Sequence, residues 1–410
     1  MADNKQNTNP NVPNLSFKRE QSETCFDSAE RVINQKQNVP NLRFPEFIEE
    51  WDQKSISDVA NVVGGGTPDT TIAEYWDGNI QWFTPSEIGK SKYISKSERK
   101  ITQSGLNNSS AKILPQGTIL LSTRATIGEC SIAMEECSTN QGFQSLISKS
   151  NYNSEFVYYL IQTKKKDLIR NACGSTFLEI SANEVRKIKC RVPQINEQDK
   201  ITQLLSLIDK RIATQNKIIE DLKKLKVAIR DNKLNSIRKQ FGLNSQISDL
   251  LEYEQPTKYI VTDTEYSGNN ELTPVLTANK AFILGYTEET RGVYNKGECI
   301  ILDDFTLDSK LVNFPFKVKS SAIKILTSKK NISLRYVFEY LNYQGLETSE
   351  HKRHYISEIE PMMISYPTDE KIISNFCKVM DLYEQKIEIE NNYLQSLLSQ
   401  KSYLLSNMFI

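Results

Sequence analysis

The sequence predicts an α+β fold: two mixed α/β heads separated by two long antiparallel coiled-coil helices, related as a pseudo-two-fold tandem repeat. Three observations predict it. Two long segments lack Gly and Pro and carry apolar residues at helical spacing. An offset of 175 residues superimposes one on the other, and strand-like segments before them recur 180 residues apart.

The first helix is expected from about Glu197 to Ser236 and the second from about Asp369 to Ile410. Their apolar stripes are Ile201, Leu205, Ile208, Ile212, Ile219, Leu222, Ile229 and Phe376, Met380, Tyr383, Ile387, Leu394, Leu397, Leu404. Even the polar interruptions coincide, because Gln215 matches Glu390 and Lys226 matches Lys401. Stripes of equal length favour antiparallel pairing of two like halves. The alternative is two unrelated amphipathic helices.

This pattern divides the chain into five segments. They are a poorly ordered N-terminal tail at 1–36, a first head at 37–192, a central helix at 193–240, a second head at 241–366 and a C-terminal helix at 367–410. The tail contains NVPNLSF at 11–17, which returns as NVPNLRF at 38–44. We interpret the first copy as a duplicated start sequence.

The composition excludes several classes of protein. Lys and Arg number 51, Asp and Glu number 51, and there are two His and seven Cys without a C-x-x-C pair. Neutral charge argues against a protein that coats DNA, and irregularly spaced cysteines suit reduced thiols. No apolar run approaches the ~18 residues that span a bilayer, and no secretory signal is visible, so we expect a cytoplasmic protein with no membrane contact.

Enzymatic motifs fail in their required context. TPSEIGKS at 84–91 lacks the first Gly of a phosphate-binding loop, and GGG at 64–66 does not lead into a helix. Asp69 with Glu98 and Lys100 forms a loose nuclease-like pattern, which keeps a stand-alone restriction endonuclease as one alternative. A coiled-coil scaffold without a DNA role is another. We expect no catalytic residue, metal or cofactor in this chain.

Positive charge collects between residues 155 and 240, where 19 Lys and Arg face ten Asp and Glu, an excess of nine. Lys164, Lys165, Lys166 and Arg170 form one group. A run of charge is commonly a solvated helix face. The functional interpretation is contact with DNA phosphates, which holds a duplex without reading its sequence.

Polar loop residues of the first head could read base edges. LSTRATIGE supplies Ser122, Thr123 and Arg124, and STNQGFQ supplies Asn140 and Gln141. Arg pairs with guanine, Asn or Gln with adenine, and Ser or Thr with either. The alternative is that these residues only make turns.

A family resemblance joins these features. GGGTPDTTIAEYWDGNIQWFTPSEI at 64–88 closely resembles the opening motif of target-recognition domains in the DNA specificity subunit of type I restriction-modification systems. NVPNLRFPEF at 38–47 with Trp51, NQGF at 140–143 and PQINEQDKI at 193–201 resemble further motifs of these subunits.

The resemblance implies a non-catalytic subunit whose two domains each read one half of a split, asymmetric site in double-stranded DNA, while the helices fix the spacer. It also implies two methyltransferase (modification) subunits as partners, which bring S-adenosylmethionine for adenine methylation. Restriction/translocase subunits, which use ATP, would then join the complex.

The second head departs from the first. It lacks GGGTP, and its segments EYEQPTKYIVTD and TPVLTANKAFILGYTEE resemble another subgroup of these domains. Asp303 and Asp304 stand where the offset of 180 places Thr123 and Arg124. The half-sites should therefore differ. The expected DNA contacts are Thr84, Ser86, Ser122, Thr123, Arg124, Asn140, Gln141, Lys164, Lys165, Lys166, Arg170, Ser175, Thr176, Lys258, Tyr259, Thr277, Asn279, Lys280, Lys352, Arg353, His354 and Tyr355.

Overall fold

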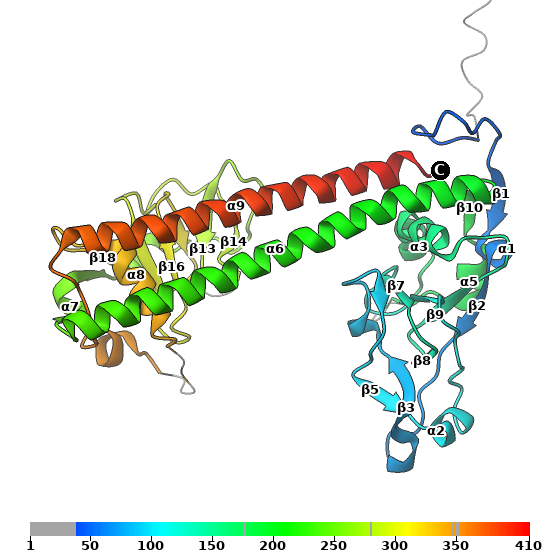
Figure 1. Cartoon of the computed structure of the whole chain (residues 1–410), viewed down its shortest axis with the longest axis horizontal. Helices are drawn as coiled ribbons and strands as arrows, with labels where there is room; N and C mark the ends of the chain where they lie inside the picture. Colours follow the sequence, from blue (N-terminus) through cyan, green and yellow to red (C-terminus); the bar gives the residue numbers. More distant parts are fainter. Residues whose placement is uncertain (1–37, 175–177, 279–280, 347, 349–351) are drawn as a thin grey trace, which may run out of the picture. The chain divides into compact units, whose positions relative to one another are not determined.

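The computed structural model describes residues 38–174, 178–278, 281–346, 348 and 352–410 (Figure 1). The chain divides into unit 1, which is Met1–Thr202 with Leu405–Ile410, and unit 2, which is Gln203–Leu404. Both contain strands and helices, in agreement with the predicted mixed α/β class. In the described ranges, no helix combines the length and the apolar character that a membrane span requires.

Unit 1 contains a five-stranded sheet in the order β2-β9-β6-β7-β4 and a three-stranded sheet in the order β5-β3-β8. Neighbours are antiparallel except β4 with β7 and β3 with β8. The apolar run Ile119–Leu121 is fully buried because its strand lies between two neighbours. The strands are β2 Ala60–Gly64, β3 Trp76–Phe83, β4 Tyr93–Ile94, β5 Arg99–Ile101, β6 Ile119–Leu121, β7 Cys130–Ala133, β8 Cys137–Thr139 and β9 Gln144–Ser148.

A two-stranded antiparallel ribbon, β1 (Asp52–Ser55) with β10 (Lys189–Val192), closes unit 1. Its helices are α1 Ile56–Val59, α2 Gln103–Asn107, α3 Ser154–Thr163, α4 Lys165–Arg170 and α5 Ala182–Lys187, with 3-10 turns η1 Ala73–Tyr75 and η2 Pro85–Glu87. The Asn153 side chain caps α3 by accepting hydrogen bonds from the backbone N–H groups of Glu155 and Phe156. This cap fixes the start of a helix whose apolar face is buried.

Unit 2 also contains two larger sheets and a two-stranded ribbon. Its four-stranded sheet runs β12-β18-β15-β16, its three-stranded sheet β14-β13-β17, and its ribbon β11-β19. The strands are β11 Ser245–Gln246, β12 Leu251–Glu254, β13 Thr273–Leu276, β14 Ile283–Thr287, β15 Cys299–Asp303, β16 Ser309–Val312, β17 Lys317–Val318, β18 Ile323–Ser328 and β19 Met363–Ile364. The shorter helices are α7 Ile247–Leu250, η3 Pro256–Tyr259, α8 Leu334–Tyr343 and η4 Tyr355–Ile359.

The two long helices are α6 (Ile195–Phe241) and α9 (Glu370–Asn407), close to the predicted bounds. Within unit 2 they pair along their apolar stripes, where Ile208, Ile219, Met380, Ile387 and Leu397 are buried. Ion pairs join Asp209 to Lys401 and Lys226 to Glu384. Because the higher number on one helix meets the lower on the other, the helices run antiparallel, as predicted.

Within unit 1, the segment 38–51 is attached to the start of α6 through the buried carboxylate of Glu197. Arg43 Nε lies 2.8 Å from Glu197 Oε1, and Arg43 Nη2 lies 2.8 Å from Oε2. The Trp51 indole N–H donates to the same carboxylate at 3.3 Å. Leu42 N donates to Asn407 O at 2.8 Å. The second NVPNL segment is therefore held at this position, while its first copy lies outside the described residues.

Arg43→Ala should destabilise unit 1. The substitution leaves the Glu197 carboxylate, which is 2% exposed, with the Trp51 N–H but no cation. Removing one partner of such a pair costs about 3 kcal/mol of unfolding free energy, which denaturant unfolding followed by circular dichroism would measure. Lys54→Ala, which breaks an exposed pair with Asp52, is the matched control. Equal effects of the two substitutions would contradict this role of Glu197.

Candidate nucleic-acid interface

Loops of unit 1 that are distant in sequence meet around Gly142. Thr123 donates from both N and Oγ1 to Gly142 O, at 2.8 Å and 3.0 Å. Asn140 Oδ1 accepts from Gly142 N at 2.8 Å. The hydroxyl of Thr67 donates to Gln141 Oε1. These contacts bring together loops 122–126 and 140–142 and the segment after GGG.

The glycines of this region permit close approach of backbone segments. A Cβ at Gly65 would lie 2.0 Å from Asn140 O, and one at Gly66 would lie 2.3 Å from Ala111 N. Backbone atoms cannot yield to such contacts, so only glycine fits at either position. The GGG run therefore packs segments together, and Thr67 follows it directly.

Thr84 and Ser86 belong to the same surface. Thr84 directly precedes η2; its Oγ1 lies 3.0 Å from Ser86 Oγ and donates to Glu87 Oε2 at 2.7 Å. A Cβ at Gly142 would lie 2.9 Å from Pro85 Cγ, which places the turn against the Gly142 loop. We call Thr67, Thr84, Ser86, Arg124, Asn140 and Gln141 the first-head loop surface.

Arg124 is exposed at the edge of this surface. Its Nε lies 2.8 Å from Glu179 Oε1, and the two side chains are 45% and 39% exposed. Ala125, the next residue, has φ of +55°, in the left-handed region that a residue with Cβ rarely adopts. The guanidinium is therefore presented by a tightly turned loop.

The basic residues of α4 differ in their surroundings. Lys164 Nζ donates to Ile410 O at 2.8 Å, and Lys165 Nζ lies 2.5 Å from Glu129 Oε1. Arg170 lies 3.3 Å from Asp167 and is 75% exposed. Lys166 is exposed. Lys166 and Arg170 are thus better placed for an external anion than Lys164.

Several of the predicted contact residues are buried. Ser122 and Thr123 are fully buried, and Tyr259, Thr277, His354 and Tyr355 are 6%, 7%, 2% and 1% exposed. Ser122 Oγ donates to Arg124 O, so it supports the loop rather than facing outward. Among the other predicted contacts, Ser175, Thr176, Asn279 and Lys280 lie outside the described residues.

In unit 2, Asp304 explains why His354 and Tyr355 are buried. Its Oδ1 accepts from the backbone N–H groups of His354 at 3.1 Å and Tyr355 at 2.7 Å. Its Oδ2 lies 3.1 Å from Lys324 Nζ, and both side chains are nearly fully buried. Lys258, Lys352 and Arg353 are exposed, and Lys352 lies 3.3 Å from Glu358.

The nuclease-like residues have separate contacts. Asp69 accepts hydrogen bonds from Thr71, which lower the pKa of Asp69. Lys100 lies opposite Gln81 in the β3–β5 pairing, and the backbone N–H of Glu98 donates to Glu87. No group of three or more His, Cys, Asp or Glu suited to a metal ion occurs among the described residues.

Sequence reasoning missed Thr67 and Glu179. Thr67 could have been found because it directly follows the glycine run, where the backbone must approach other loops. Glu179 gave no such signal, because a carboxylate is unfavourable beside phosphate and its pairing with Arg124 depends on the tertiary fold.

The family comparison covers unit 1 and the start of α6. Residues 48–224 match the family described as "Type I restriction modification DNA specificity domain". The chain is 40% identical over 191 residues to the Type I restriction enzyme MjaIX specificity subunit of Methanocaldococcus jannaschii, covering 45% of this chain and 44% of that protein. It is 46% identical over 127 residues to the Type I restriction enzyme EcoR124I/EcoR124II specificity subunit of Escherichia coli, covering 30% and 31%.

The chain thus spans less than half the length of these curated relatives. The fold likeness extends further. The crystal structure of the type I restriction-modification system S subunit from M. genitalium aligns with a TM-score of 0.53 at 16% identity, over 91% of this chain and 99% of that one. At this identity the likeness concerns the fold.

Glu289 should make the stability of unit 2 depend on acid pH. Its hydrogen bonds with Lys317 Nζ, 2.6 Å away, and with the hydroxyl of Thr262 and N–H of Asp263 lower the pKa of Glu289 to about 2. A lowered pKa stabilises the fold above the ordinary value of 4.5, and this contribution is lost as pH falls toward about 2.

The measurement is the unfolding free energy of wild type and Glu289→Gln across this range. The difference should be largest near neutral pH and shrink below about 4.5. Glu288→Gln removes the adjacent exposed carboxylate and controls for loss of one negative charge. A pH-independent effect of Glu289→Gln would contradict the ion pair.

Proposed function

We propose that the chain is the sequence-specific DNA-binding subunit of a type I restriction-modification complex, because residues 48–224 match the DNA specificity domain of these systems. Each head reads one half of a bipartite, asymmetric site in duplex DNA, and the helix pair fixes the spacer. The observation that carries the proposal is the first-head loop surface, where Arg, Asn, Gln, Thr and Ser side chains suited to base edges lie together.

A pseudo-two-fold tandem repeat of domains 37–192 and 241–366 with helices 193–240 and 367–410 is supported by the polar pairs. Adding 175 to Asp209 gives Glu384, and adding 175 to Lys226 gives Lys401. The observed pairs Asp209–Lys401 and Lys226–Glu384 are therefore equivalent to each other. Such exchange of equivalent partners is expected of an isologous contact.

The two heads read different half-sites under this proposal. The first presents Arg124, whereas Asp303 and Asp304 in the second are 8% and 1% exposed and bind backbone N–H groups. Lys258 and Arg353 are the exposed cations proposed for the second head. Lys166 and Arg170 provide sequence-independent phosphate contact in the first.

Two mostly exposed strips on the helix pair support two methyltransferase subunits as partners. Each residue of the α9 strip lies 175 positions after its counterpart in the α6 strip. The strips are Leu204, Leu207, Arg211, Thr214 and Ile218 on α6, and Val379, Leu382, Lys386, Ile389 and Tyr393 on α9. Leu207 and Leu382 are 58% and 64% exposed. A strip that repeats its apolar and basic positions suits two copies of one partner. Four residues of the α6 strip and Tyr393 of the α9 strip line a groove of about 620 Å³.

Chemistry in this proposal belongs to the partners. The methyltransferase subunits bind S-adenosylmethionine and methylate adenine, and restriction/translocase subunits that use ATP join through the complex. Purified chain with Mg²⁺ alone should neither cut nor methylate DNA. Cleavage by the chain alone, lost on Asp69→Asn, would instead favour the stand-alone endonuclease, and absence of DNA binding by the complex would favour a scaffold.

Arg124→Ala should relax specificity at one base of one half-site, by about 1–3 kcal/mol. Lys166→Gln with Arg170→Gln should instead weaken binding to all sequences alike and reduce the salt dependence. Binding of the assembled complex to duplexes with single-base changes at several salt concentrations separates the effects. The reverse pattern would show that the roles are exchanged.

Leu207→Asp should remove one of two methyltransferase subunits, and Leu207→Asp with Leu382→Asp should remove both, because a buried carboxylate in an apolar contact is unfavourable. The mass of the purified assembly measures this stoichiometry. Val227→Asp alters an exposed apolar residue outside both strips and is the control. Unchanged stoichiometry in the double variant would rule out the strips as docking surfaces.

A further inference from the structure

Lys226 interrupts the apolar stripe of α6 between Leu222 and Ile229. Its side chain is 15% exposed, and Nζ lies 3.2 Å from Glu339 Oε1 and pairs with the Glu384 carboxylate. A lysine at such a position loses hydration and apolar packing, so it is tolerated only with charged partners. The partners come from two other helices, α8 and α9.

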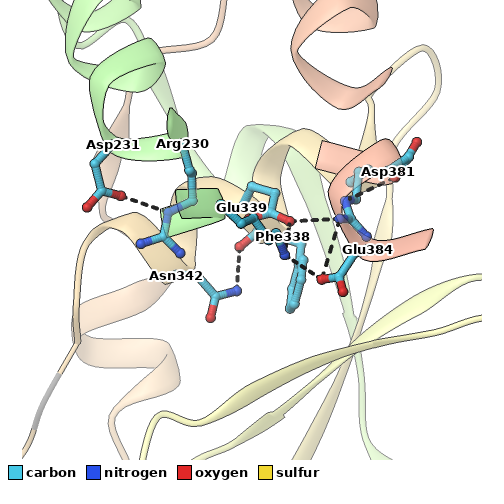
Figure 2. Close-up of polar contacts among 9 residues, drawn as sticks. Arg230, Asp231, Phe338, Glu339, Asn342, Asp381 and Glu384 are labelled. Atoms are coloured by element: carbon cyan, nitrogen blue, oxygen red, sulfur yellow. Dashed lines mark hydrogen bonds and ion pairs between the residues drawn. The ribbon is translucent and has the colours of Figure 1, made fainter. Parts of the chain in front are cut away.

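Glu339 on α8 is the centre of the contacts. Its side chain is 1% exposed, and Oε1 lies 2.9 Å from Arg335 Nη2 as well as 3.2 Å from Lys226. Arg335 reaches α9, with Nε 3.5 Å from Asp381 Oδ1 and Nη2 3.8 Å from Glu384 Oε1. Figure 2 shows Glu339 of α8 beside Asp381 and Glu384 of α9. We call the five residues the three-helix charge cluster.

The cluster lies beside water-accessible space rather than in a dry core. A cavity of about 760 Å³ is lined by its members together with Arg230, Lys310, Asn313 and Asn342. Arg230 is held by Asp231 at 2.8 Å. Polar groups could face this cavity without forming a buried pair, so the pairing of Glu339 with two cations calls for a reason other than stability.

One ion pair of the three-helix charge cluster has a counterpart elsewhere on the helix pair. The contact between Lys226 and Glu384 has an equivalent 175 residues away, in which Lys401 Nζ lies 2.7 Å from Asp209 Oδ1. The link between the long helices is thus duplicated in the chain.

The α8 members have no equivalent of the same charge. The offset of 180 places Glu155 where α8 has Arg335 and Tyr159 where it has Glu339. In unit 1, Glu155 pairs with Lys92 at 2.5 Å, and Lys92 also donates to Tyr159.

We propose that the three-helix charge cluster is a positioning device that fixes the second head on the helix pair and so makes the complex strict about the number of base pairs between its half-sites. This inference rests on the proposed function. Apolar contacts between helices tolerate small shifts, whereas a buried carboxylate is costly unless it stays close to its cations. A looser α8 would let the second head meet DNA at neighbouring spacings.

The test replaces Lys226→Met, Arg335→Met and Glu339→Leu together in the full complex with its methyltransferase subunits. Binding is measured on duplexes that carry both half-sites at the preferred spacing and at spacings one base pair shorter or longer. Affinity at the preferred spacing should stay within about threefold, while its advantage over shifted spacings should fall about tenfold or more. Half-site sequence preference should not change.

Three controls keep the result decisive. Lys224→Met with Glu220→Leu removes an exposed pair on the same helix and should leave spacing preference unchanged. Lys226→Arg keeps the charge and should keep the preference. Glu339→Gln is a smaller change and should weaken the preference for one spacing. It replaces the triple variant in the test if the triple variant does not fold.

A folded triple variant, or a folded Glu339→Gln variant, that retains the full preference for one spacing overturns the inference. Equal loss of affinity at every spacing also overturns it, because the cluster would then only hold the fold together. A wild-type complex with no preference for paired half-sites refutes the proposed function instead, so the two failures are distinguishable.

Discussion

The antiparallel register of α6 and α9 in unit 2 is the constraint on which the rest of the chain depends. Gln215 Nε2 donates to Glu390 O at 2.9 Å, and the ion pairs Asp209–Lys401 and Lys226–Glu384 flank this contact. Apolar stripes alone permit slippage by a heptad, whereas a slip here would break all three polar contacts at once. The polar interruptions therefore select one register among several that the apolar residues allow.

That register carries two further consequences. It places the exposed strips on the helix surface at positions that correspond by the same offset, and it brings Lys226 and Glu384 to where α8 can join them. The cores of the heads and the contacts of Glu197 then hold loops whose exposed side chains differ between the halves. Under the proposed function, the corresponding strips serve like partners and the unlike loops read unlike DNA sequences.

The long helices, their direction and the matching interruptions could be predicted from the sequence, because helical periodicity is local and extends over many turns. The contact between Gln215 and Glu390 could not be predicted, because two residues that correspond in a sequence repeat need not be close in space. Loop side chains were harder still. Ser122 and Thr123 have the chemistry of base-reading residues, yet hydrogen bonds to Arg124 O and Gly142 O turn them inward. The burial of His354 and Tyr355 depends on Asp304, fifty residues away, which no local pattern reveals.

The most direct test of a helix-set spacer is to insert one heptad after Leu222 in α6 and one after Ile387 in α9. These two points lie opposite each other in the antiparallel pair, so the ion pairs Asp209–Lys401 and Lys226–Glu384 are both kept. Sequences bound by the assembled complex are then selected from randomised duplexes and compared with those of wild type. We predict the same two half-sites separated by a longer gap. An altered half-site with an unchanged gap would contradict the account, because the helices would then contribute to reading sequence rather than to spacing.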